Sequence, residues 1–274
     1  MRITTLVENA LHPSRGDLKA EHGLSFYVEH QGHVFVSDVG QSGNFAVNAK
    51  QIGVDLTRVD VLAITHHHYD HGGGLARFMQ ENSSAKIYLR WSEKVDYVAK
   101  TPLKPVRYIG LDQEVLEKNS DRIVYLSNNH EIRPGIHLLM EIPQLYPKPG
   151  GDQRLKTKLG RKIQPDTFDH ELVTVLIGEQ GLVILTGCAH NGLLNMITAV
   201  KTVFPDRPIQ AVIGGFHLKR ENAQAVRQIG EVFLDMDIPK IFTGHCTGDE
   251  SYAVLKSVLG ERLHRLYTGL EMAF

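Results

Sequence analysis

Six consecutive residues, 66–71, carry four side chains that can bind a metal ion: His66, His68, Asp70 and His71. They follow the apolar run 59–65, whose valines and isoleucine predict a buried strand. Three glycines come next and allow the backbone to turn sharply. The four side chains should therefore lie at the carboxyl end of a core strand, where α/β proteins tend to place their sites.

The spacing of the four side chains predicts two metal positions. Imidazole and carboxylate groups suit Zn, Fe or Mn. His66 and His68 are two residues apart on an extended segment and point the same way, so we expect them to bind a first ion. Asp70 and His71 lie past the strand end and can turn towards a second ion. Each ion needs about three protein ligands, so further ligands must come from elsewhere in the chain.

The second half of the chain repeats the order of a strand, a glycine-rich turn with a histidine, and a helix. Its strands are expected at 182–186, 209–213 and 240–242, and the turns after them carry His190, His217 and His245. Strand–helix alternation predicts α/β architecture. It also places these three histidines at the same end of one sheet.

Residues 92–170 show less regular patterning and contain seven prolines. The stretch 146–162 is rich in Pro, Gly, Lys and Arg, and it fits either a mobile segment beside the site or a solvated loop. No linker is evident. We therefore predict one domain over 1–274, with an irregular insertion around 92–170 beside the site.

Composition and charge narrow the class of partner. A hydrophobic fraction of 42% is ample for a core, and a formal net charge of −1 gives no bias towards nucleic acid or an anionic membrane. No signal peptide and no membrane-spanning run is evident. The only cysteines, Cys188 and Cys246, each lie near a histidine, which favours a reduced protein. We expect a cytoplasmic protein that acts on a small-molecule substrate, without membrane or nucleic-acid partners; homo-oligomerisation is left open.

The segment 66–71 resembles the His-x-His-x-Asp-His signature of the metallo-β-lactamase superfamily. The segment 37–42 is similar to the superfamily's early strand-Asp-x-Gly element. Further segments are similar to a subgroup of metal-dependent hydrolases in that superfamily: 6–9, 20–25, 186–190, 214–218 and 243–248. The subgroup includes dihydropterin-ribofuranosyl-aminobenzene-phosphate synthases. The resemblance covers nearly the whole chain, and it implies a four-layer αβ/βα sandwich with a dinuclear metal centre.

The resemblance also implies which residues complete the two metal sites. The family places a ligand after the strand that precedes His190, so His190 is expected at the first metal. The last ligand histidine of related hydrolases follows a late strand, so His245 is expected at the second. His217 is either a ligand in place of one of these or an acid that protonates the leaving group.

The chain departs from the family pattern at Gly187-Cys188, where many members carry a bridging Asp. Thiolate is a good zinc ligand, so Cys188 is a candidate ligand to the second metal; the alternative is a small buried residue. Asp38 is expected to orient a motif histidine through a hydrogen bond. Asp169 and His170, just before the hairpin, are further candidates.

These features predict a hydrolase with two divalent metal ions. Zinc is the expected metal, and Fe and Mn are the alternatives. Asp70 would position the metal-activated water, and His217 would supply a proton. A group of basic residues favours a small anionic substrate, phosphorylated or carboxylated: Lys148, Lys156, Lys158, Arg161 and Lys162. The alternatives are a pterin-related synthase of the methanopterin-pathway type, a non-catalytic metal- or ligand-binding sensor, and an iron redox centre.

Overall fold

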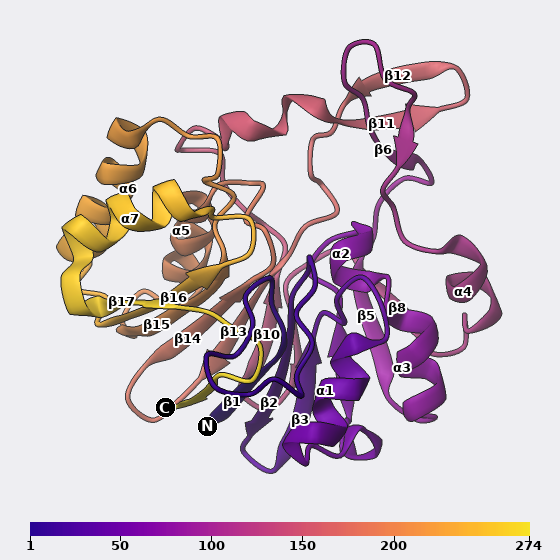
Figure 1. Ribbon diagram of the computed structural model, residues 1–274, viewed down its shortest axis with the longest axis horizontal. Coiled ribbons are helices and arrows are strands. Elements are labelled where there is room, and N and C mark those ends of the chain that lie inside the picture. The colour runs from indigo at the N-terminus through magenta and orange to yellow at the C-terminus, as the bar shows by residue number, and fades with distance from the viewer.

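The computed structural model describes residues 1–274, in which two seven-stranded sheets pack face to face (Figure 1). The first has the order β18-β1-β2-β3-β4-β5-β8, and the second has the order β17-β16-β15-β14-β13-β10-β9. Helices cover the outer face of each sheet. This confirms the predicted four-layer αβ/βα sandwich.

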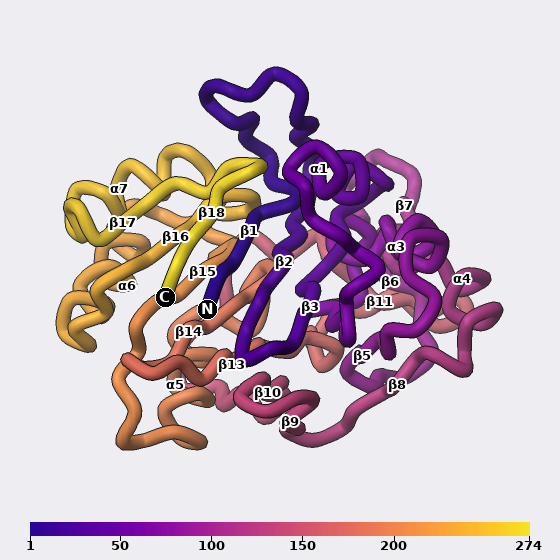
Figure 2. Tube along the Cα trace, turned by 90° about the horizontal axis from the view of Figure 1, so that it is seen from below, coloured from indigo at the N-terminus to yellow at the C-terminus, as the bar shows by residue number.

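The strands of the first sheet come from the N-terminal half of the chain, except for one edge strand, which is the last strand of the chain. Its strands are β1 (Arg2–Val7), β2 (Ser25–His30), β3 (His33–Ser37), β4 (Val61–Ala63), β5 (Lys86–Arg90), β8 (Ile123–Leu126) and β18 (Glu271–Ala273). The strands from β3 to β8 run parallel, whereas β18 pairs antiparallel with β1 and brings the two chain ends together (Figure 2). Helices α1 (Asn44–Ile52) and α3 (Leu75–Glu81) pack outside this sheet.

The second sheet comes from the C-terminal half. Its strands are β9 (His130–Arg133), β10 (Ile136–Leu139), β13 (Val173–Ile177), β14 (Leu182–Thr186), β15 (Ile209–Gly215), β16 (Lys240–Gly244) and β17 (Leu263–Arg265). Its outer face is covered by α5 (Leu193–Val203), α6 (Ala223–Asp235) and α7 (Asp249–Leu259). Strands β14 to β17 are parallel, so the turns that follow them meet at one edge. None of the helices combines the length and the apolar character that crossing a bilayer requires.

The core alternates along each strand. In β4 and the residue after it, Val61 and Ala63 belong to the cluster between the two sheets, while Leu62 and Ile64 pack with the residues of α1 and α3. β14 alternates in the same way between the central cluster and the helices α5 to α7. Both faces of these strands are buried, which explains why their sequences are continuous apolar runs.

Residues 92–170 contain more regular structure than the sequence predicts. Besides β8, β9, β10 and helix α4 (Gln113–Lys118), they form a third sheet from β6 (Asp96–Ala99), β7 (Arg107–Tyr108), β11 (Leu155–Leu159) and β12 (Lys162–Pro165). The 3-10 turn η2 (Gly150–Arg154) leads into β11. The third sheet stands above the edge at which the strands of the main sheets end (Figure 1). Its pairings join distant segments, so short-range periodicity does not reveal them.

Candidate metal centre

The motif residues lie where strand β4 ends between the two main sheets. All four, His66, His68, Asp70 and His71, are buried. The last two belong to the short helix α2 (Tyr69–Gly72). A Cβ at Gly74 would approach the carbonyl oxygen of Val39 to 2.2 Å, so the glycine run is required for the chain to leave the site.

A first cluster consists of His66, His68 and His190, the last from the turn after β14. One ring nitrogen of each lies within 4.8 Å of the others. The Nε2 atoms of all three are buried and have no hydrogen-bond partner in the protein. Buried polar atoms are nearly always paired, so three unpaired imidazole nitrogens at one point match a metal site.

The protonation of this cluster also suits a metal ion. Burial lowers the pKa of His66 well below its ordinary value, and it lowers the pKa of His190 to about 4 although Asp152 opposes the shift. Both rings are therefore neutral at pH 7 and keep a lone pair for coordination.

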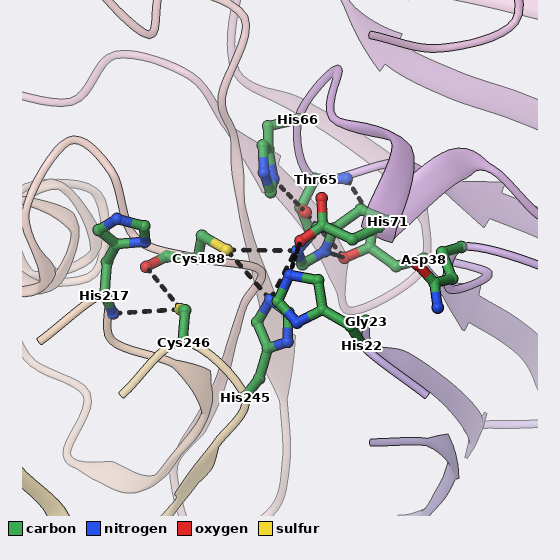
Figure 3. A network of polar contacts seen from close by, with 12 residues as sticks. His22, Gly23, Asp38, Thr65, His66, His71, Cys188, His217, His245 and Cys246 are labelled. Carbon is green, nitrogen blue, oxygen red and sulfur yellow. Dashed lines mark hydrogen bonds and ion pairs between the residues drawn. The ribbon is translucent and has the colours of Figure 1, made fainter. Parts of the chain in front are cut away.

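A second cluster consists of Asp70, His71, Cys188 and His245. The Sγ atom of Cys188 lies 3.3 Å from His71 Nε2 and 3.4 Å from His245 Nε2, as Figure 3 shows. The Oδ2 atom of Asp70 lies 3.4 Å from His245 Nε2. Two imidazoles, one carboxylate and one thiol are donors of the kind that zinc prefers. The cluster therefore has the composition of a zinc site.

His22 adds an imidazole at the outer side of the second cluster. Its Nε2 lies 3.2 Å from Asp70 Oδ2, and its ring stacks on His245 with the centroids 4.8 Å apart (Figure 3). Its side chain is half exposed and lines the adjoining cavity. The resemblance of the segment around residue 22 to the family is the only sequence signal that points to it.

Polar groups outside each cluster hold the rings by their second nitrogen. Asp38 Oδ2 lies 2.7 Å from His71 Nδ1, Asn9 Oδ1 lies 2.9 Å from His245 Nδ1, and Asp152 Oδ1 lies 3.0 Å from His190 Nδ1. When Nδ1 donates to such a group, the Nε2 lone pair faces the opposite way. The arrangement turns the Nε2 atoms towards the two clusters.

Asp38 reaches both clusters through a short chain of hydrogen bonds. The Thr65 hydroxyl donates to Asp38 Oδ2 over 2.8 Å and lies 3.1 Å from His66 Nδ1 (Figure 3). Burial alone would lower the pKa of His71, but the charge and hydrogen bond of Asp38 raise it to about 9. Asp38 therefore makes the contact that the sequence predicted for it, and its effect is greatest at His71.

Several turns around the site have left-handed backbone conformations at residues other than glycine. Asp38, Phe168, Ala189, His217 and His245 have φ between 49° and 60°. Such conformations are uncommon outside glycine and cluster at functional sites. Here they occur where the chain leaves a strand, and they aim the side chains inward.

His217 and Asp152 form a further part of the site. Asp152 comes from η2 in the insertion, and its Oδ1 lies 2.8 Å from His217 Nε2 as well as 3.0 Å from His190 Nδ1. Burial opposes ionisation of Asp152, yet the charges and hydrogen bonds of the two histidines lower its pKa. Burial also opposes protonation of His217, but Asp152 and Cys246 raise its pKa to about 10. We therefore find an ion pair, Asp152 with His217, beside the first cluster.

Two buried glutamates hold the turns that carry His190 and His245. Glu171 accepts hydrogen bonds from the backbone N–H of His190 and Asn191, at 2.8 and 2.7 Å, and Glu8 accepts one from the backbone N–H of His245. Burial raises the pKa of Glu171 to about 7, although these hydrogen bonds act to lower it. Sequence reasoning missed both residues. An acidic residue directly beside an apolar strand was the available signal.

The candidates just before the hairpin belong to neither of the two main clusters. His170 forms a group with His68 and Asp166; its Nε2 is 3.2 Å from Asp166 Oδ2, and its Nδ1 accepts from the His67 backbone N–H. Asp169 is exposed and accepts from the Thr167 hydroxyl, so it joins no cluster. Asp166 is the buried carboxylate of this segment, and the sequence did not distinguish it from Asp169.

A cavity of about 160 Å³ opens onto both clusters. His68, Asp70, His190, His217 and His245 line its floor. None of the five basic residues that were predicted to attract the anion lines this cavity; Lys148, for example, donates to the Thr167 carbonyl oxygen instead. Arg154, from the same segment, does line it, and the sequence did not single it out. The cationic walls are Arg107, Arg154, Lys219 and Arg220.

Residues 18–201 match the family model of the metallo-β-lactamase superfamily, which covers more than half of the chain. The chain belongs to the metallo-β-lactamase superfamily, and with its buried His, Asp and Cys clusters it is a metal-dependent hydrolase-like enzyme of that group. This confirms the resemblance that the motifs indicated.

Individual relatives refine that placement. The crystal structure of Tm1679, described as a metal-dependent hydrolase of the β-lactamase superfamily, superposes with a TM-score of 0.85 at 26% identity, covering 100% of this chain and 99% of that one. The 7,8-dihydropterin-6-methyl-4-(β-D-ribofuranosyl)-aminobenzene-5'-phosphate synthase of Methanocaldococcus jannaschii is 26% identical over 267 residues, 93% of this chain and 90% of its own. Zn²⁺-bound PqqB from Methylobacterium extorquens shares the fold at 11% identity, with a TM-score of 0.59 and full coverage of both chains.

Proposed function

We propose that the protein is a metal-dependent hydrolase of a small anionic substrate, phosphorylated or carboxylated, with two divalent ions at its two clusters. The observation that carries the proposal is the convergence of three buried, unpaired Nε2 atoms from His66, His68 and His190. The second cluster lies beside the first, and both face the same cavity. This geometry is suited to a substrate that contacts both ions.

In this proposal, His66, His68 and His190 hold the first ion, and Asp70, His71, His245 and Cys188 hold the second. A bound divalent ion lowers the pKa of water towards neutrality and polarises the bond to be broken. Zinc is our first choice, because imidazole, carboxylate and thiolate together suit it; iron and manganese are the alternatives.

The side chains that line the cavity supply the remaining functions. Asp70 is placed to orient the attacking water while it serves as a ligand. His217 lies at the cavity beside Asp152, which stabilises its protonated form, so it can hold the proton that the leaving group needs. Arg107, Arg154, Lys219 and Arg220 give the cavity a positive wall, which supports an anionic substrate.

Metal analysis of the purified protein and of His68→Ala tests the site. We expect His68→Ala to lower the metal content and to abolish hydrolysis, because one of three ligands of the first ion is removed. His130→Ala is the control, since His130 is exposed on β9 and contacts neither cluster. Full metal occupancy in His68→Ala would overturn the assignment.

Turnover assays test the reaction class. The protein loaded with zinc, iron or manganese should hydrolyse at least one class among generic phosphomonoesters, phosphodiesters and thioesters. The second candidate is a pterin-related synthase, which the similarity to the M. jannaschii enzyme over 93% of the chain favours. If no metal form hydrolyses any of these substrates while the protein binds a pterin tightly, the synthase replaces the hydrolase.

A further inference from the structure

Four basic side chains from three segments meet at the cavity over the metal clusters. Arg107 comes from β7, Arg154 from the end of η2, and Lys219 and Arg220 from the loop after β15. The first two belong to the insertion and the last two to the second main sheet. Their meeting is therefore a product of the way in which the third sheet lies over the site.

The three arginines of this group lack acidic partners. Several arginines elsewhere in the chain pair with carboxylates, as Arg262 does with Asp237 at 2.9 Å and Arg265 with Asp249 at 2.6 Å. Next to Arg220, the carboxylate of Glu221 instead accepts a hydrogen bond from the backbone N–H of Gly150.

The carboxylate of Asp152 offsets the positive charge of Arg154 only in part. Its Oδ1 is engaged by His190 and His217. Burial lowers the pKa of Arg154, and the positive charges of Arg220 and Arg107 lower it further. Like charges held together without a counter-charge are unfavourable, which an anionic ligand would relieve.

The position of the group relative to the clusters defines where the anion would lie. Arg154 is two residues from Asp152, whose carboxylate contacts His190 and His217, and Lys219 is two residues from His217. The guanidinium of Arg107 lies over the ring of Tyr69, 5.4 Å from its centroid, next to the ligand candidate Asp70. An anion held here is therefore adjacent to the reacting bond.

We propose that Arg107, Arg154 and Arg220, supported by Lys219, form a phosphate subsite that selects phosphorylated substrates. The proposal rests on the proposed hydrolase function and narrows its substrate class from any anion to phosphate. A guanidinium matches two phosphate oxygens at once, and several guanidiniums suit a dianionic phosphate better than a monoanionic carboxylate. The cavity of about 160 Å³ is smaller than the roughly 300 Å³ at which pockets for drug-sized ligands begin. It therefore accommodates the phosphate end of a substrate, and a bulkier remainder would extend outwards.

Binding of inorganic phosphate to the metal-loaded full chain, measured by isothermal titration calorimetry, tests the subsite. Arg107→Gln, Arg154→Gln and Arg220→Gln should each weaken phosphate binding about tenfold, the expected loss for one charge-assisted hydrogen bond. Arg227→Gln is the matched control: Arg227 is exposed on α6 outside the cavity, and this variant should bind phosphate as the unmodified protein does. Acetate should bind at least about tenfold more weakly than phosphate, because it carries a single charge.

Metal content, measured on the same samples, separates this proposal from the hydrolase itself. The arginine variants should keep their metal, so a loss of phosphate affinity at constant metal content supports the subsite. Equal phosphate affinity in all three arginine variants and the unmodified protein would overturn it, as would acetate binding as tight as that of phosphate. Neither result would affect the hydrolase proposal, which fails only if metal binding or hydrolysis is lost.

Discussion

The two donor clusters lie side by side but differ in chemistry. The first contains only histidines, whose Nε2 atoms have no partner in the protein. The second mixes nitrogen, oxygen and sulfur, and its members already contact one another, as Cys188 does with His71 and His245. His66 and His190 are neutral and ready to bind a metal ion, whereas His71 and the thiol of Cys188 must first lose their protons.

The carboxylates outside the two clusters contribute to this difference. The negative charge of Asp38 raises the pKa of His71 to about 9, whereas the carboxylate of Asp152 contacts both His190 and His217. Burial keeps His190 neutral, with a pKa of about 4, and the positive charge of His217, whose pKa is about 10, lowers the pKa of His190 further. Asp38 therefore stabilises a proton on His71, which is a proposed ligand, whereas Asp152 stabilises a proton on His217, which is the neighbour of the proposed ligand His190.

Replacement of the sulfur donor is expected to have the largest effect on this contrast. Cys188→Ser should weaken the second metal by about 100-fold or more and leave the first in place, because a neutral hydroxyl is a poor zinc ligand. Metal content after dialysis against a graded series of chelator concentrations measures this. The control is Cys246→Ser, since Cys246 contacts the His217 backbone N–H and the Cys188 carbonyl oxygen and belongs to neither cluster. Equal metal content in Cys188→Ser and unmodified protein would remove Cys188 from the ligand set.

The two outer carboxylates should act on different metals. Asp152→Asn is expected to weaken the first metal, and Asp38→Asn mainly the second, each by about 10- to 100-fold, the usual cost of losing a carboxylate that orients a ligand. Competition with a chromophoric chelator gives both affinities. Should Asp152→Asn weaken only the second metal, the grouping of His190 with His66 and His68 would be wrong.

The number of protons released on metal binding is the smallest expected effect, and it reports directly on the protonation of the two clusters. At neutral pH, metal binding to the second cluster should release the proton of His71, whose pKa is about 9, while the first cluster releases none from His190, whose pKa is about 4. Calorimetry of the metal-depleted protein in buffers of different ionisation enthalpy counts these protons. Equal proton release in both binding steps would contradict the contrast.

The ion pair of His71 with Asp38 makes the stability of the metal-depleted protein depend on pH. Because the pKa of His71 is raised on folding, its ion pair with Asp38 stabilises the fold fully below the ordinary histidine pKa. That stabilisation is lost as the pH rises through about 9. Urea denaturation across this range should show a fall that Asp38→Asn lacks.

The parts of the site that lie close together in sequence could be predicted. The stretch 59–74 combines strand, ligands and glycines, so the place of the ligands at a strand end followed from local patterning. His190, His217 and His245 follow parallel strands, and the carboxyl ends of such strands meet at one edge of a sheet.

The parts that come from the insertion could not be predicted. Asp152 reaches His190 and His217, and Arg154 and Arg107 reach the cavity, because β6 pairs with both β11 and β7, contacts between distant segments that leave no local signal. The irregularity expected for 92–170 reflected this lack of short-range pattern. The choice between Asp169 and Asp166 also depended on the tertiary structure, in which Asp169 is exposed whereas the side chain of Asp166 is buried.

Sequence alone therefore determined the α/β alternation of this protein and the edge at which its histidines gather, because apolar periodicity specifies which face of each strand is buried. Its four layers followed from the resemblance to the family. Only the tertiary structure decided which donors share a cluster and which cations share the cavity. Those groupings depend on distances of a few ångströms between side chains from separate sheets. Such distances are set by how the sheets pack and how each turn leaves its strand, which no stretch of sequence encodes locally.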